Sequence, residues 1–127
     1  MTLDEAAADL LQSCSEKNWD GYDAPPVKKE TIDRALMTAK IIAFWLPHVP
    51  EPGFAVCPDG SVDLDWYEDN DHLLNWCIDP DLPDVWVYRN GDEKSYGTFK
   101  NYWLDTQLMY ELLNKLYPEV LKKLGIE

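Results

Sequence analysis

The chain has 127 residues, of which 46% are hydrophobic and 13% aromatic, and its formal net charge is −13. This length suits one domain with a core of its own, and so apolar a composition excludes a disordered acidic tail. Because 24 acidic residues stand against 11 basic ones, phosphates would be repelled, which disfavours direct binding to nucleic acid or to an anionic membrane.

Two helices are predicted in the first fifty residues. Thr2 and Glu5 have the spacing of a capping box, and apolar residues then recur at helical spacing, so we expect a helix over 3–17. A connector rich in glycine and proline follows. A second helix is predicted over 28–46, where a long apolar stripe ends at Pro47.

After residue 53 the hydrophobic pattern alternates with a period of two, which is typical of strands. Short turns separate the segments, so we expect an antiparallel meander of four to five strands. The predicted strands are 54–57, 62–67, 72–78, 85–88 and 96–99. A last helix is predicted over 104–124, with a separate final turn from Pro118. The expected fold is a single α+β domain over 1–127, with two N-terminal helices, a C-terminal helix and all helices on one face of the sheet.

Turn chemistry predicts how the first strands pair. Pro58-Asp59-Gly60 suits a three-residue loop, and we expect a second loop at Asp69-Asn70-Asp71. The expected cross-strand pairs are Cys57 with Ser61, Val56 with Val62, Trp66 with Leu74, Leu64 with Trp76, and Val62 with Ile78. The opposite face then receives Asp63, Asp65, Tyr67, Leu73, Asn75 and Cys77. A slip of one residue would bury the aspartates, so the pattern favours this register.

The excess of acid is concentrated in residues 51–84, which contain ten acidic residues and no Lys or Arg. Aspartates in turns are ordinary, because their side chains bind nearby backbone amides. Asp63 and Asp65 differ, since Asp is depleted in strands and neighbouring carboxylates repel. A solvated surface and a surface that meets a cationic partner both explain the pair. The candidate partner-binding residues are Asp63, Asp65, Tyr67, Glu68, Asp69, Asp71, Asp79, Asp81 and Asp84. Trp86 and Tyr88 are predicted as further aromatic anchors, beside Tyr67.

Other chemistries are disfavoured. The alternating oxygens from Asp59 to Asp65 lack the glycine and the glutamate of a calcium loop, because Leu64 and Asn70 occupy those positions. The two histidines have no metal-ligand spacing, and no nucleophile motif or phosphate loop occurs. We therefore expect no catalytic residue, no metal and no cofactor. Three widely spaced cysteines and an acidic N-terminus without an apolar stretch predict a cytoplasmic protein.

The connector carries a distinctive motif, Asn18-Trp19-Asp20-Gly21-Tyr22-Asp23-Ala24-Pro25-Pro26-Val27. It resembles small bacterial and mobile-element proteins that have a WDGY-x-A-x-P segment between two helices, followed by a Pro-Asp-Gly hairpin with an acidic strand. The resemblance covers roughly residues 10–80, implies this layout and transfers no catalytic residue. Physically, we expect Trp19 and Tyr22 to pin the connector to the core, although a binding site on the motif is an alternative.

These observations favour a protein that binds another protein. The leading hypothesis is an acidic inhibitor that occupies the basic nucleic-acid-binding surface of its partner, similar in type to anti-CRISPR and anti-restriction proteins of phages and mobile elements. An antitoxin or immunity protein that caps a basic toxin is the first alternative. A small acidic enzyme or a carbohydrate-binding module is the second, and the leading hypothesis assigns no enzymatic activity.

Overall fold

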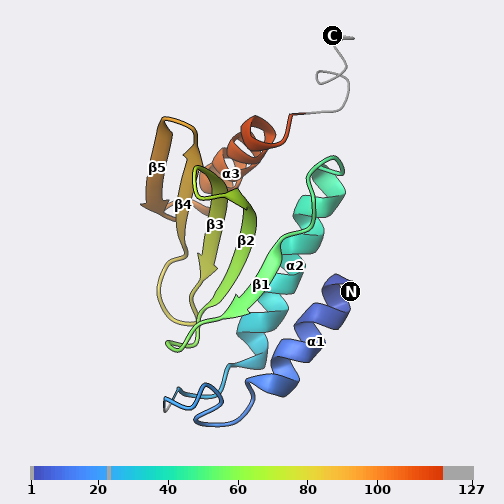
Figure 1. The fold of residues 1–127 in the computed structure, drawn as a ribbon, viewed down its shortest axis with the longest axis vertical. Coiled ribbons are helices and arrows are strands. Elements are labelled where there is room, and N and C mark those ends of the chain that lie inside the picture. Colours follow the sequence, from blue (N-terminus) through green and yellow to red (C-terminus); the bar gives the residue numbers. More distant parts are fainter. Residues whose placement is uncertain (1, 23, 119–127) are drawn as a thin grey trace.

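The computed structural model describes residues 2–22 and 24–118, and it confirms the α+β fold (Figure 1). Two helices come first, a five-stranded antiparallel sheet follows, and a third helix packs last. The elements are α1 (Leu3–Ser13), α2 (Lys29–Trp45), β1 (Gly53–Val56), β2 (Val62–Asp69), β3 (His72–Ile78), β4 (Val85–Asn90), β5 (Glu93–Thr98) and α3 (Tyr102–Leu116).

The sheet is a meander in which the strands lie in sequence order, from β1 at one edge to β5 at the other. Every predicted pair between β1, β2 and β3 is confirmed, including Leu64 opposite Trp76. The second hairpin loop differs from the prediction: Asp69 pairs with His72 inside the ladder, and the register shifts between Tyr67 and Asp69. A bulge at this point lets β2 run further than the pattern of turn residues indicated.

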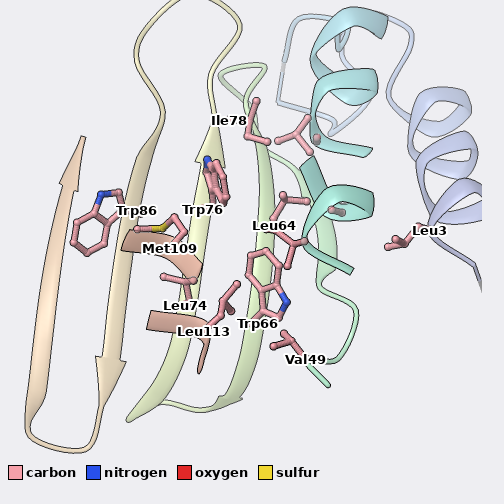
Figure 2. Packing of buried hydrophobic residues seen from close by; sticks show 14 of the residues in the cluster. Leu3, Val49, Leu64, Trp66, Leu74, Trp76, Ile78, Trp86, Met109 and Leu113 are labelled. Atoms are coloured by element: carbon pink, nitrogen blue, oxygen red, sulfur yellow. The ribbon is translucent and has the colours of Figure 1, made fainter. Parts of the chain in front are cut away.

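All three helices cover one face of the sheet, which we call the covered face. α1 packs beside α2 and touches β1, α2 lies against β2 and β3, and α3 lies against β3 and β4. Figure 2 shows Trp66, Trp76 and Trp86 on the side of the sheet from which Met109 and Leu113 of α3 approach. These side chains belong to one buried apolar cluster, so the core lies between the covered face and the helices.

Two helix ends differ from their predictions. α1 stops at Ser13 rather than at residue 17, because Cys14 leaves helical geometry with a φ of −116° and a ψ of 15°, and its carbonyl accepts the N–H of Val27. The chain then turns at Asn18, which has a φ of 64° and donates its N–H to the carbonyl of Ala24. α3 ends at Leu116. Most of the final turn predicted from Pro118 lies outside the described residues.

The connector is fixed by its own hydrogen bonds. The Trp19 indole donates to the carbonyl of Pro25 at 2.8 Å, and Asp20 Oδ1 accepts the amides of Tyr22 and Ala24. Gly21 has a φ of 78°, as a tight turn requires. Trp19 therefore holds the connector as predicted, but the prediction for Tyr22 is wrong: its side chain is 89% exposed.

Candidate functional site

The face of the sheet that points away from the helices, which we call the open face, carries the unusual strand aspartates. Asp63 lies opposite Ala55 and Cys77, and Asp65 lies opposite Gly53 and Asn75. Their neighbours on β1 are small, and both residues are only half-buried. The other members of the open face are Tyr67, Leu73, Val85, Val87, Arg89, Lys94, Tyr96 and Thr98.

Asp65 is held in an environment that disfavours its charge. Partial burial raises the pKa of its carboxyl above the ordinary value, and the negative charge of Asp63 raises it further, while a hydrogen bond with Asn75 opposes the shift. Within the described chain, neither Asp63 nor Asp65 forms an ion pair with Lys, Arg or His. The two carboxylates are therefore an uncompensated charge on a partly desolvated surface.

Cys57 and Cys77 lie near Asp63, and their thiols are unreactive at neutral pH. Burial raises the pKa of the Cys77 thiol to about 12, and burial likewise raises the pKa of Cys57. A thiol with so high a pKa is almost entirely protonated at neutral pH and is a poor nucleophile. Among the described residues, no three His, Cys, Asp or Glu side chains come together in a way that could hold a metal ion.

The aspartates in the turns have local partners that stabilise their charge. Asp59 accepts the amide and the hydroxyl of Ser61, and these bonds lower the pKa of its carboxyl. Asp69 contacts His72 Nδ1 at 2.9 Å and accepts the amide of Asp71, and these interactions lower its pKa as well. Turn aspartates of this kind shape loops, in contrast with Asp65, whose surroundings work against its charge.

The three aspartates of the β3–β4 loop, Asp79, Asp81 and Asp84, form contacts with other residues of the chain. Asp84 pairs with Arg34 of α2 and accepts the Trp76 indole N–H at 3.0 Å, and its side chain is only 13% exposed. Asp79 accepts the amides of residues 81 and 82, which closes the loop. Asp81 lies 3.7 Å from Lys28 Nζ, with both side chains exposed. The charge of Asp84 is thus neutralised by a structural contact.

The nine predicted partner-binding residues do not form one patch. Only Asp63, Asp65 and Tyr67 lie on the open face; Glu68, Asp69 and Asp71 belong to the β2–β3 hairpin end; and Asp79, Asp81 and Asp84 belong to the β3–β4 loop. In a meander, these two connections lie at opposite ends of β3. The structure therefore separates the acidic segment into three places, of which the open face is central.

The predicted aromatic anchors on β4 are wrong. Trp86 and Tyr88 are 8% and 0% exposed and lie on the covered face. The open face instead presents Val85, Val87 and Tyr96, whose side chains are 40%, 41% and 83% exposed. These three residues line a shallow depression of about 600 Å³ over β4 and β5. The hairpin turn at Gly91 is a local signal that sets Val87 opposite Tyr96, but it does not say which face of the sheet they share.

The charge changes sign across the open face. Arg89 and Lys94 form a cross-strand pair on β4 and β5, near the β2–β3 hairpin. Arg89 Nη1 also donates to the carbonyl of Asn70 at 3.3 Å. The open face therefore has an acidic part on β2, an apolar part on β4 and β5, and a cationic corner.

Comparisons of the chain with protein-family models, with curated proteins and with solved structures found no match. In the described part of the chain, no helix combines the length and the apolarity that a membrane crossing requires.

Proposed function

We propose that this protein binds a basic partner protein through the open face of its sheet. One observation carries the proposal: Asp63 and Asp65 lie side by side on a partly buried strand without a cationic partner in the described chain. Neighbouring like charges cost stability, and partial burial adds to this cost at Asp65. A guanidinium or ammonium group from a partner would offset both costs through charge-assisted hydrogen bonds.

The apolar part of the open face suits the same interaction. Protein interfaces combine an aromatic or aliphatic centre with polar groups at the rim. Tyr96 of β5 lies opposite Val87 of β4, so this apolar part is two to three strands away from the aspartates of β2. A partner surface that fits this arrangement has arginine or lysine beside exposed apolar side chains.

The class of partner follows from the charge of the whole chain. A net charge of −13 attracts cationic surfaces from a distance, and the most cationic protein surfaces are those that bind nucleic acid. The protein would then act as an inhibitor that competes with the phosphates of DNA or RNA, in the manner of anti-CRISPR or anti-restriction proteins. The site that supports this proposal needs no catalytic residue and no cofactor.

Affinity capture from a bacterial lysate, with and without nuclease, would identify the partner. We expect the double variant Asp63→Lys/Asp65→Lys to bind it at least about tenfold more weakly than the parent protein. The matched control is Asp9→Lys/Glu16→Lys, which changes the net charge equally at two exposed residues of α1 and its C-terminal flank, on the helix side of the sheet rather than on its open face. We expect this control to keep most of the affinity.

Two further measurements sharpen the test. Added duplex DNA should displace the protein from its partner, and raising the salt concentration should weaken the complex because ionic contacts are screened. Equal affinities for the two double variants would show that the open face is not the interface. A captured toxin that binds no nucleic acid would contradict the inhibitor and support an immunity protein that uses the same face.

A further inference from the structure

The outer side of α2 carries an apolar surface that the core does not use. Met37, Ile41 and Phe44 are 59%, 39% and 76% exposed. An α-helix turns by about 100° per residue, so these three positions fall within an arc of about 60°. Trp45, which is 64% exposed, extends this surface towards α3. We refer to Met37, Ile41, Phe44 and Trp45 as the outer stripe.

The outer stripe is distinct from the buried side of the same helix. The residues of α2 and its C-cap that enter the core are Ile32, Ala35, Ala39, Ile42 and Leu46. By the same helical geometry, they lie on the opposite side from Met37, Ile41 and Phe44. The rings of Phe44 and Trp45 contact each other edge to face, with centroids 5.4 Å apart, yet both remain mostly exposed. An exposed apolar patch of this kind marks an interaction site.

We propose that the outer stripe binds a second copy of this chain, with the two α2 helices packed against each other across a two-fold axis. Spacings of four and then three residues, as in Met37, Ile41 and Phe44, form the seam along which two helices pack. In an isologous contact the same patch serves both subunits, so one stripe supplies both halves of the interface.

Charge favours a second copy over the basic partner. Residues 27–50, which contain α2, carry four basic and two acidic residues, whereas residues 51–84 carry ten acidic and no Lys or Arg. Each of these four bases is paired with an acid, so α2 is close to neutral: the pairs are Lys28 with Asp81, Lys29 with Asp33, Arg34 with Asp84 and Lys40 with Asp4. Two chains of charge −13 therefore meet less repulsion at the outer stripe than at the acidic open face. The strand aspartates lie on the open face, beyond the sheet from α2, and would point outward in the dimer. A cationic surface gains no attraction at the stripe.

The exposed area is sufficient for an interface. If a whole aromatic side chain offers roughly 200 Å², the exposed 76% of Phe44 and 64% of Trp45 amount to roughly 280 Å² on one subunit. Two subunits then bury roughly 560 Å² from these rings alone, more than half of the roughly 1,000 Å² that a specific interface requires. Met37 and Ile41, which are 59% and 39% exposed, add to this area.

Sedimentation equilibrium of the full chain tests the proposal. We expect a mass near twice the 14.7 kDa of one chain, at chain concentrations of about 0.1 mM. Phe44→Asp and, separately, Met37→Asp should raise the dimer dissociation constant at least about tenfold, because each places a charge in the apolar contact. Tyr22→Asp is the matched control, since Tyr22 is 89% exposed in the connector before α2 and its substitution should leave the dimer intact.

The salt dependence of binding distinguishes the dimer proposed here from the complex with a basic partner. Raising the salt concentration screens the repulsion between two acidic chains and should strengthen the dimer, whereas it should weaken an ionic complex at the open face. A chain that stays monomeric at 0.1 mM in about 0.5 M salt would overturn the proposal. A dimer that survives both stripe variants, each shown to be folded by its thermal unfolding, would overturn it as well.

Discussion

On the covered face of the sheet, Trp66 and Trp76 are each 1% exposed and lie in the central apolar cluster. On the open face of β2, the strand that carries Trp66, Asp63 and Asp65 are half-buried without a cation from the described chain. Alternate residues of one strand therefore perform separate tasks. Substitutions on the covered face should change stability, whereas substitutions on the open face should change binding and leave stability nearly unaltered or improved.

The largest expected effect is the loss of a core tryptophan. Trp66→Ala should lower the free energy of unfolding by about 3–5 kcal/mol, because it removes a buried ring and the hydrogen bond from its indole to the carbonyl of Pro50. Urea denaturation measures this change. The control is Tyr96→Ala on the open face, which should stay within about 0.5 kcal/mol of the parent. Similar losses for both variants would contradict the division between the faces.

A smaller effect is expected at Gly97 on the covered face, where the glycine leaves room for the ring of Trp86. A Cβ at Gly97 would lie 3.0 Å from Cζ2 of Trp86, which packs over this glycine. Gly97→Ala should therefore destabilise the fold by about 1–3 kcal/mol in thermal or urea unfolding. Gly53→Ala on β1 is the matched control, since its Cβ would only approach the carbonyl of Asp65 at 3.7 Å. An unchanged stability for Gly97→Ala would show that Trp86 can move aside.

The smallest effect has the opposite sign. Asp65→Asn should stabilise the protein by about 0.2–1 kcal/mol at neutral pH, because it removes one of two adjacent charges. Since the folded state raises the pKa of Asp65, the folded protein holds that proton more tightly than the unfolded chain does. The destabilisation by Asp65 is therefore complete above the folded-state pKa and disappears as the pH falls below the unfolded value.

Unfolding of both proteins across the acidic range checks this sign. The gain from Asp65→Asn should shrink towards zero in acid. Asp59→Asn is the control with the reverse expectation, because bonds from Ser61 lower the pKa of Asp59 and stabilise its charge. Asp59→Asn should therefore destabilise the fold at neutral pH. A gain from Asp65→Asn that persists in acid would point to a cause other than charge.

The β1–β3 part of the sheet was predictable because local chemistry specifies it. The Pro58-Asp59-Gly60 loop and the alternation of Leu64 and Trp66 with the aspartates agree on one register. The pattern of β4 has apolar residues on both faces and does not select the buried one, and the prediction that Trp86 and Tyr88 are interface anchors is wrong. The turn at Gly91 sets only which residues of β4 and β5 lie opposite each other. The buried face of β4 follows from its pairing with β3, where Trp86 lies opposite Trp76.

The state of individual charges could not be predicted in the same way. Asp84 and Arg34 are fifty residues apart in the chain, and only packing of α2 near the β3–β4 loop brings them together. Tyr22 looked like a core anchor beside Trp19, yet the connector turns it into solvent. In both cases the outcome depends on contacts between segments that local pattern does not relate.

The sequence by itself determined that a strongly acidic sheet exists and that Asp63 and Asp65 share one of its faces, because a strand alternates its side chains strictly. Only the tertiary structure decided which acids stay unpaired and that Tyr96 accompanies them. It also decided that the outer stripe of α2 stays exposed. The physical reason is that a helix with two apolar sides can bury either one, and the choice is made by the sheet against which it packs.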